Sequence, residues 1–153
     1  MDVIFLDIDG VLNCTGKKTE LTPEGYNGIE DELIENVREI VSQTRAEIVL
    51  SSSWRKIWDK NPNKCNEDGL YLNEKLDRYN LKVVDKITSK KGFKGNGIKD
   101  FIKENNVQKY VILDDKDHWD FDDELNAHLV KVNPFLGLTE HDAYKAIKIL
   151  FKD

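Results

Sequence analysis

Two aspartates at the end of the first apolar segment constrain this chain more than any other feature. The segment Val3-Ile4-Phe5-Leu6 runs directly into Asp7-Ile8-Asp9, and Gly10 follows. A short, uninterrupted apolar run is typical of a buried parallel strand, and ligand sites of open α/β sheets lie just beyond the carboxyl ends of such strands. Gly10 allows the chain to turn sharply at once. The sequence therefore predicts two carboxylates in a site at the carboxyl edge of a parallel sheet.

Further strands and helices alternate along the chain. The other predicted strands are Glu47–Leu50, Tyr110–Leu113, His128–Val132 and a weaker one, Leu81–Val84, which extends at most to Ile87. Amphipathic segments with helical periodicity are Ile29–Val41, Leu70–Tyr79, Gly97–Asn105 and a last one that starts at the N-cap residue Thr139 and includes Phe151. The polar stretch 59–69 is predicted to be a surface loop. This alternation predicts an α/β fold of three α/β/α layers around a mostly parallel sheet of about five strands.

Length and composition restrict the class of protein. A chain of 153 residues is expected to form one domain. No apolar stretch is long enough to span a membrane, and the N-terminus lacks the basic region of a signal peptide. Cys14 and Cys65 form neither a metal-type pair nor a disulfide framework, so we expect a reducing cytoplasm. The net charge of −6 argues against indiscriminate binding to nucleic acid.

The polar residues at the strand ends are expected to meet at one edge of the sheet. They are Asp7 and Asp9, Ser51 and Ser52, the Lys90–Lys94 region, and Asp114 and Asp115. Carboxylates, hydroxyls and an ammonium group together suit phosphate chemistry with a divalent cation. The sequence therefore predicts a phosphate site that contains a metal.

Charge gives the physical reason for the cation. A carboxylate that attacks a phosphate monoester faces another anion, and Mg²⁺ held by oxygen ligands reduces that repulsion. Asp7 and Asp114 are predicted ligands through their carboxylates and Asp9 through its carbonyl, with Asp115 expected behind Asp114. Lys94 and Ser51 would then hold the other phosphate oxygens. Asp9 would protonate the leaving oxygen and later deprotonate a water molecule.

These residues together resemble the four motifs of the haloacid dehalogenase (HAD) superfamily. Asp7-Ile8-Asp9-Gly10-Val11-Leu12 is similar to its first motif, and Ser51 ends the second strand as the Ser/Thr of motif II does. Lys94 is similar to the lysine of motif III, and Asp114-Asp115 to the acidic motif IV. The resemblance covers nearly the whole chain. It implies a single HAD-like domain over residues 1–153, with a Rossmann-like core, Mg²⁺ and an aspartyl-phosphate intermediate.

Finer features resemble a small group of HAD domains that are associated with RNA-repair proteins. The segments that carry this resemblance are Ser51–Arg55, Lys94–Ile98, Leu113–Asp115 and Gly137–Thr139. Where that group often has Arg-Gly-x-Glu-Ile, this chain has Lys94-Gly95-Asn96-Gly97-Ile98. Lys90 and Lys91 therefore compete with Lys94 for the motif III position.

Several residues near these motifs have more than one interpretation. Gly10 and Ser52 are expected on the substrate side of the site, although the serine run also suits an N-cap. Arg55 could contact a substrate phosphate or base, and Trp54 is expected to pack in the core. The other candidates have structural interpretations: Trp119 and Phe121 should pack, with a rim beside Asp115 as the alternative, and His118, His128 and His141, which lack metal-ligand spacing, should be structural or exposed.

The connections are too short for a large cap over the site. Fewer than twenty residues lie between Asp9 and the helix near Ile29. An open, minimally capped site suits a bulky substrate, such as a polynucleotide end or a phosphoprotein. A basic strip would favour a nucleic-acid terminus, with a solvated lysine face as the alternative; its members would be Arg55, Lys56, Lys86, Lys90, Lys91 and Lys94.

Three other functions stay open at this point. A small-metabolite or nucleotide phosphatase would use the same catalytic residues on another substrate. A phospho-acceptor domain of the receiver type also combines acids, a hydroxyl and a lysine on an α/β sheet. A HAD-like binding module would keep the fold without catalysis, against which the intact acids argue.

Overall fold

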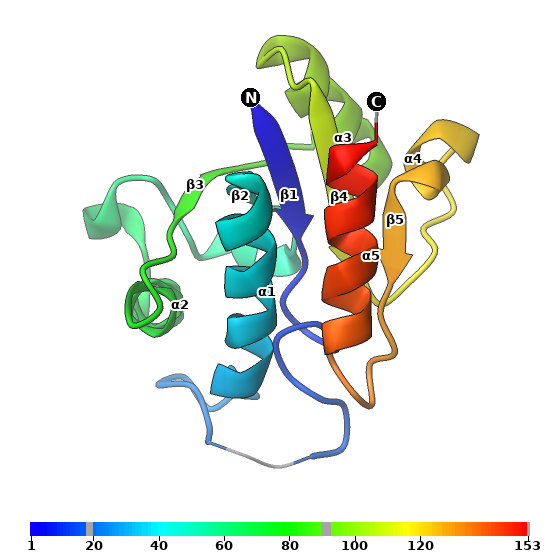
Figure 1. Ribbon diagram of the computed structural model, residues 1–153. Helices are drawn as coiled ribbons and strands as arrows, with labels where there is room; N and C mark the ends of the chain where they lie inside the picture. Colours follow the sequence, from blue (N-terminus) through cyan, green and yellow to red (C-terminus); the bar gives the residue numbers. More distant parts are fainter. Residues whose placement is uncertain (18–19, 90–92, 153) are drawn as a thin grey trace.

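In the part of the chain that the structure describes, five parallel strands form the central sheet, in agreement with the predicted, mostly parallel sheet of about five. The computed structural model describes residues 1–17, 20–89 and 93–152. The strand order is β3-β2-β1-β4-β5 (Figure 1). The bounds are β1 (Asp2–Leu6), β2 (Glu47–Leu50), β3 (Val83–Lys86), β4 (Lys109–Asp114) and β5 (Leu129–Lys131). The fold is the predicted α/β, Rossmann-like arrangement, with β1 in the middle of the sheet.

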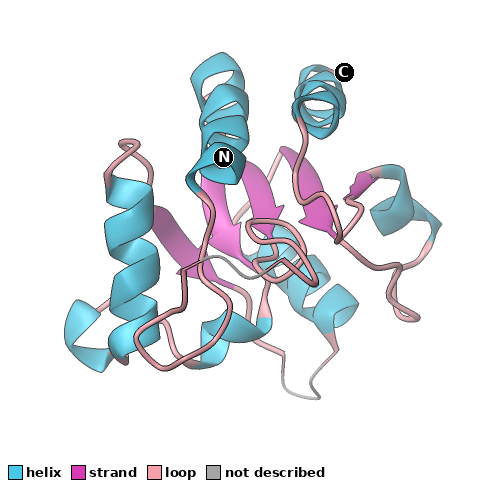
Figure 2. Cartoon of the chain, turned by 90° about the horizontal axis from the view of Figure 1, so that it is seen from below, coloured by secondary structure: helices cyan, strands magenta, loops and turns pink. Residues whose placement is uncertain are grey.

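Helices cover both faces of this sheet (Figure 2). They are α1 (Asp31–Thr44), α2 (Glu67–Asp77), α3 (Lys94–Glu104), α4 (Asp123–Ala127) and α5 (Glu140–Phe151), with the 3₁₀ turns η1 (Ser53–Lys56) and η2 (Pro62–Lys64). Apolar side chains of α1, α2 and α5 pack on one face, and those of α3 and α4 on the other. Three layers follow, as the alternation of strands and helices predicts.

The side chains of β1 alternate between these two cores. Ile4 and Leu6 pack toward α1 and α5, whereas Val3 and Phe5 pack toward α3. All four are fully buried. Because both faces of a parallel strand are covered, the strand is apolar at every position rather than at every second one.

Several element boundaries differ from the predicted ones. Glu30 is the N-cap of α1, so this helix begins after the predicted start at Ile29. The Asn66 side chain caps α2 by accepting a hydrogen bond from the Gly69 amide, so the predicted loop 59–69 contains both η2 and the start of α2. Thr139 forms the predicted cap of α5, within a full capping box. The prediction missed α4, which is only one turn long.

The register of the strands aligns their polar ends. Leu6 pairs with Leu50 of β2 and with Leu113 of β4. The ladder continues one residue further, because the Ser51 amide donates to the Leu6 carbonyl at 3.0 Å and the Asp7 amide to the Leu113 carbonyl at 3.0 Å. The residues after the three strands therefore lie side by side. They do so where the strand order reverses, which is the usual ligand site of such sheets.

The connection from β1 to α1 lies over this carboxyl edge as a flap. Leu21 and Asn27 form an antiparallel bridge within it. In the part of the chain that the structure describes, no segment forms a separate cap domain over the strand ends. In that same part, no helix has the length and apolar character that crossing a membrane requires.

Candidate active site

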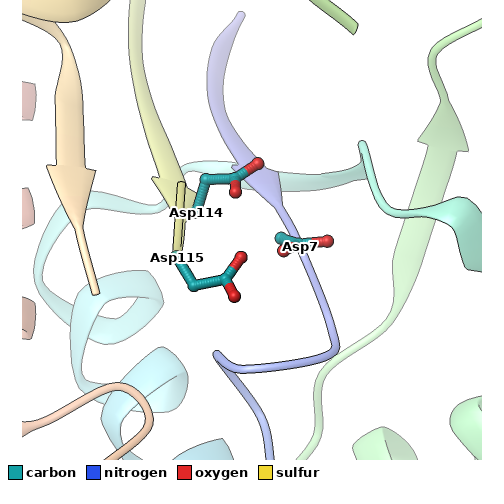
Figure 3. A group of neighbouring side chains, drawn as sticks. All are labelled: Asp7, Asp114 and Asp115. Atoms are coloured by element: carbon teal, nitrogen blue, oxygen red, sulfur yellow. The ribbon is translucent and has the colours of Figure 1, made fainter. Parts of the chain in front are cut away.

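Three carboxylates converge at the ends of the two central strands (Figure 3). Asp7 follows β1, Asp114 ends β4 and Asp115 is the next residue. Each offers an oxygen atom, and these atoms lie within 4.8 Å of one another. Side chains two positions apart on a strand point to the same face of the sheet. Asp7 therefore points to the face of Phe5, and Asp114 to the face of Ile112. This is the face that α3 covers, so the two carboxylates meet there.

Lys94 supplies a positive charge between two of these acids. Its Nζ lies 2.6 Å from Asp114 Oδ2 and 3.6 Å from Asp7 Oδ1. The predicted helix start at Gly97 was wrong, because Lys94 is itself the first residue of α3. The competing candidates Lys90 and Lys91 lie outside the described residues.

The loop after β4 holds the start of α3, and with it Lys94, in place. The Asp120 carboxylate accepts hydrogen bonds from the amides of Gly95 at 2.7 Å and Asn96 at 3.3 Å. A Cβ atom at Gly95 would lie 2.5 Å from the Asp120 carbonyl oxygen, so a larger residue would disturb this contact. Gly97, which replaces the glutamate common in the resembling group, packs against Ile87 near the end of β3.

Burial and charge together change the acidity of the three carboxyl groups. Burial raises the pKa of Asp7 to about 7, with Lys94 opposing and the charges of Asp114 and Asp115 adding to the rise. Burial and the charge of Asp114 also raise the pKa of Asp115. Burial acts against ionisation of Asp114 as well, yet hydrogen bonds from His118 and Lys94 lower its pKa. A cluster of this kind, with hard oxygen donors facing one another, fits a divalent cation such as Mg²⁺.

Asp114 is the most tightly held of the three acids. It is fully buried, and Lys94, the Lys116 amide and His118 all contact its oxygens. His118 Nε2 lies 3.2 Å from Asp114 Oδ2. We predicted a structural or exposed role for His118, and this carboxylate contact was missed. The sequence offers one signal for it: His118 comes four residues after Asp114, in the loop at the same sheet edge.

Asp9 lies exposed at the same edge, and two side chains orient it. Asn13 Nδ2 donates to Asp9 Oδ1 at 3.0 Å, and Trp54 Nε1 donates to Asp9 Oδ2 at 3.2 Å. The Gly10 amide donates to Asn13 Oδ1 at 2.9 Å, which closes the turn. Gly10 has φ +83° and no space for a Cβ beside Asp115. Trp54 is buried, as predicted, but its contact with Asp9 and the role of Asn13 were not foreseen.

Replacing Trp54 by phenylalanine tests whether the indole orients Asp9. The change keeps an aromatic ring in the core, but it removes the indole donor to Asp9 and some buried ring volume. If Asp9 acts as acid and base, we expect kcat for a phosphomonoester to fall about 10- to 150-fold with little change in KM, which is the effect of about one hydrogen bond to a charged group.

Trp58→Phe provides the matched control for this variant. Trp58 is equally buried, and its indole donates to Asn73 Oδ1 at 2.8 Å instead. Equal losses of kcat in the two variants would show that the effect is general loosening of the core.

The three consecutive serines, Ser51 to Ser53, have different environments. Ser51 is fully buried, and its Oγ has no hydrogen-bond partner among the described residues. The Ser52 hydroxyl caps η1 by accepting from the Trp54 amide at 3.1 Å, as the N-cap interpretation predicts. Ser53 lines the open hollow beside the acids. The Ser51 hydroxyl thus lies on the side of the sheet that Asp7 faces, and its phosphate contact stays a prediction.

The acids lie in a hollow of about 650 Å³, a volume within the usual range of ligand pockets. Its basic lining residues are Arg55, Lys94, Lys116 and His118. The Arg55 guanidinium donates to the Ser52 carbonyl at 3.0 Å, so it is held near the site. The hollow therefore offers cations for the oxygens of a phosphate beside a cluster of acids.

Two peripheral predictions need correction. Lys86 does not add a free charge to a basic strip, because its Nζ donates to the carbonyls of Arg55 at 2.8 Å and Trp58 at 2.7 Å. Trp119 is 78% exposed and contacts Phe93 edge-on, so it does not pack in the core, whereas Phe121 does. Of the other strip residues that the structure describes, Arg55 and Lys94 line the hollow beside the acids and Lys56 does not.

One comparison with known proteins found a match. A family model described as "HAD domain in Swiss Army Knife RNA repair proteins" matches residues 3–143, and so covers both strand-end acid pairs and Lys94. None of the curated proteins that were searched matches the chain.

Proposed function

Because the chain belongs to the family of HAD domains in Swiss Army Knife RNA repair proteins, we propose that it is a magnesium-dependent phosphatase. It hydrolyses phosphomonoesters through an aspartyl-phosphate intermediate. The observation that carries this proposal is the convergence of Asp7, Asp114 and Asp115 with Lys94 at the edge of an open hollow. Residues 1–153 act together as the catalytic domain.

Asp7 and Asp9 divide the chemistry between them. An Asp7 oxygen bonds to phosphorus while the bond to the leaving oxygen breaks, and Asp9 gives that oxygen its proton. Asp9 then takes a proton from water as the water oxygen bonds to phosphorus, and inorganic phosphate leaves Asp7. General acid–base help of this kind contributes roughly 10²–10⁴-fold to a rate. The donors on Asp9 hold it in position for both steps.

The three converging carboxylates are the proposed ligands of Mg²⁺. Asp7, Asp114 and Asp115 would hold it, together with the backbone carbonyl of Asp9. When bound, the cation reduces the repulsion between an anionic nucleophile and an anionic substrate. Lys94 neutralises phosphate oxygens from the α3 side, where the Ser51 hydroxyl, which has no partner among the described residues, also lies. Gly10, Ser52 and Arg55 are the proposed substrate contacts near them.

Magnesium should stabilise the protein in a pH-dependent way. The folded pKa of Asp7, about 7, lies above its ordinary 3.8, so the stability linked to its proton is full below about pH 4 and is lost as the pH rises through 7. Mg²⁺ held by Asp7 would take the place of that proton. We therefore expect millimolar Mg²⁺ to raise the melting temperature more at pH 8 than at pH 6, as measured by differential scanning fluorimetry.

An activity assay without metal tests the same proposed site. Turnover of an aryl phosphate should stop in EDTA and return with excess Mg²⁺. NaCl of equal ionic strength is the control for general screening, and Asp114→Asn should lose the thermal shift. Full activity in EDTA would contradict the proposed metal site.

The shape of the hollow and the family together suggest the substrate class. The open hollow and the RNA-repair family suit a phosphate on a nucleic-acid end, and a small metabolite or free nucleotide is the second candidate. A panel of oligonucleotides with terminal phosphates, mononucleotides and sugar phosphates separates the two. Equal kcat/KM for sugar phosphates and oligonucleotides would remove the nucleic-acid preference.

Neither of the two non-enzymatic hypotheses is favoured. The strand order β3-β2-β1-β4-β5 differs from the 2-1-3-4-5 order of flavodoxin-like receiver domains. A binding module without catalysis would not need the oriented Asp9. Both cysteines are free thiols, which suits a reducing compartment, and we place the reaction in the cytoplasm.

A further inference from the structure

A second hollow adjoins the proposed active site on the side of Asp9. Its volume is about 540 Å³, and Asp9, Asn27 and Ser53 line both hollows. In the proposed reaction Asp9 donates its proton to the leaving oxygen. The part of a substrate attached to that oxygen therefore extends past Asp9, and the second hollow is the neighbouring space that can receive it.

The walls of this second hollow suit a flat, uncharged ring. Tyr26, Trp54 and Ile57 provide its apolar surface. Tyr26 is 66% exposed, so most of its ring is available to a ligand. Carboxylates outnumber ammonium groups in the lining, which disfavours a further phosphate there; the charged residues are Asp9, Glu24, Asp68 and Lys56.

Hydrogen bonds fix the turn that carries Tyr26. The Tyr26 amide donates to Thr22 Oγ at 2.9 Å, and the Thr22 amide donates to the Tyr26 carbonyl at 2.8 Å. Asp68, buried in the first turn of α2, accepts from Thr22 Oγ at 2.9 Å and from the Glu24 amide at 3.1 Å. The exposed ring therefore belongs to a backbone that is anchored before any ligand arrives, which reduces the entropy lost on binding.

We propose that this second hollow is a leaving-group subsite that takes the base of a nucleotide, with Tyr26 as its stacking residue. The inference rests on the proposed phosphatase activity and narrows its substrate class to nucleotides, either free or at the end of a strand. Aromatic rings stack on any base with little sequence preference. Tyr26 is a specificity residue, because a sugar phosphate without a base cannot use it.

Matched substrates test the subsite through activity. With Mg²⁺, the full chain should turn over a nucleoside monophosphate with a kcat/KM at least about tenfold above that for ribose 5-phosphate. Tyr26→Ala should reduce this preference about tenfold, the loss expected of one base–aromatic contact. Tyr26→Phe should retain it. Tyr144→Ala, which removes a similarly exposed tyrosine on α5, is the control.

Binding of unphosphorylated adenosine tests the subsite without activity. Titration should give saturable binding to the wild-type chain that Tyr26→Ala weakens about tenfold, with ribose as the negative control. Activity without preference for a base, together with no adenosine binding, would overturn the subsite and leave the phosphatase standing. Tyr26-dependent adenosine binding without any phosphatase activity would overturn the proposed function and leave the subsite standing.

The two sources of a base are distinguished by a further pair of substrates. A higher kcat/KM for an oligonucleotide with a terminal phosphate than for the mononucleotide assigns the subsite to a strand end. Equal values assign it to free nucleotides. In both cases the Tyr26→Ala effect must appear, and its absence from both would overturn the role of Tyr26.

Discussion

Asp7→Asn is expected to reduce turnover of any phosphomonoester by roughly 10⁴-fold or more, since the amide cannot form the acyl phosphate. The change is nearly isosteric, so the sheet should be unaffected. Steady-state assays with an aryl phosphate measure the loss. Asp2→Asn, at the other end of β1, is the matched control and should keep full activity. Substantial activity in Asp7→Asn would refute the assignment of the nucleophile.

The same variant should be more stable than the wild type when metal is absent. At pH 8 the wild-type chain must keep a buried Asp7 ionised beside two other carboxylates, although its pKa is about 7 rather than 3.8. That difference corresponds to on the order of 4 kcal/mol. We expect Asp7→Asn to gain about 1–4 kcal/mol in urea unfolding in EDTA, with a smaller gain as the pH falls. A loss of stability at pH 8 would show that Asp7 is not electrostatically strained.

Asp9→Asn is expected to slow turnover by about 10²–10⁴-fold, the usual contribution of a general acid–base residue. The amide can neither give nor accept the required proton. The leaving group of an activated aryl phosphate needs little protonation. Formation of the aspartyl phosphate should therefore be slowed less than its hydrolysis. We therefore expect a burst of released phenol followed by a stalled enzyme, with phosphate retained on the protein.

Rapid quench with labelled substrate measures this retained phosphate directly. Covalent phosphate approaching one per chain would support the assignment of Asp9 to both steps. If Asp9→Asn turned over aryl phosphates at the wild-type rate without a burst, Asp9 would have no part in proton transfer. Asp117→Asn, an exposed acid paired with Lys131, serves as the control.

The strand ends were predictable because they follow from local pattern and one general rule. Apolar runs at Val3–Leu6 and Tyr110–Leu113 predicted buried parallel strands, and parallel strands necessarily bring Asp7 and Asp114 to one edge. The observed strand register pairs Leu6 with Leu113 and so places the two aspartates that follow side by side. The convergence of the acids is the part of the site that sequence alone determines best.

The contacts that hold the site residues in place were not predictable in the same way. Trp54 reaches Asp9 across 45 positions of the chain, a contact that depends on how η1 leaves β2. Asp120 caps α3 from a separate loop, so no local signal near Gly95 indicated a helix start at Lys94. Contacts of this kind depend on the tertiary arrangement rather than on periodicity.

Other differences between the predicted and observed elements have local signals in the sequence. Asn61 followed by Pro62 has the N-cap and first-turn pattern of a helix, and it begins η2. Asn66, with Glu67 and Asp68 after it, has the same character and begins α2. Because residues 59–69 include few apolar side chains, their composition predicts a loop despite these helix-capping residues.

A crystal structure with Mg²⁺ and a phosphate mimic tests the central claim most directly. We predict one cation with carboxylate oxygens of Asp7, Asp114 and Asp115 at about 2.0–2.1 Å, and the mimic between Asp7 and Lys94. The Asp9 carboxyl should face the leaving side of the mimic. A cation bound away from Asp7, or a mimic seated outside this hollow, would contradict the account.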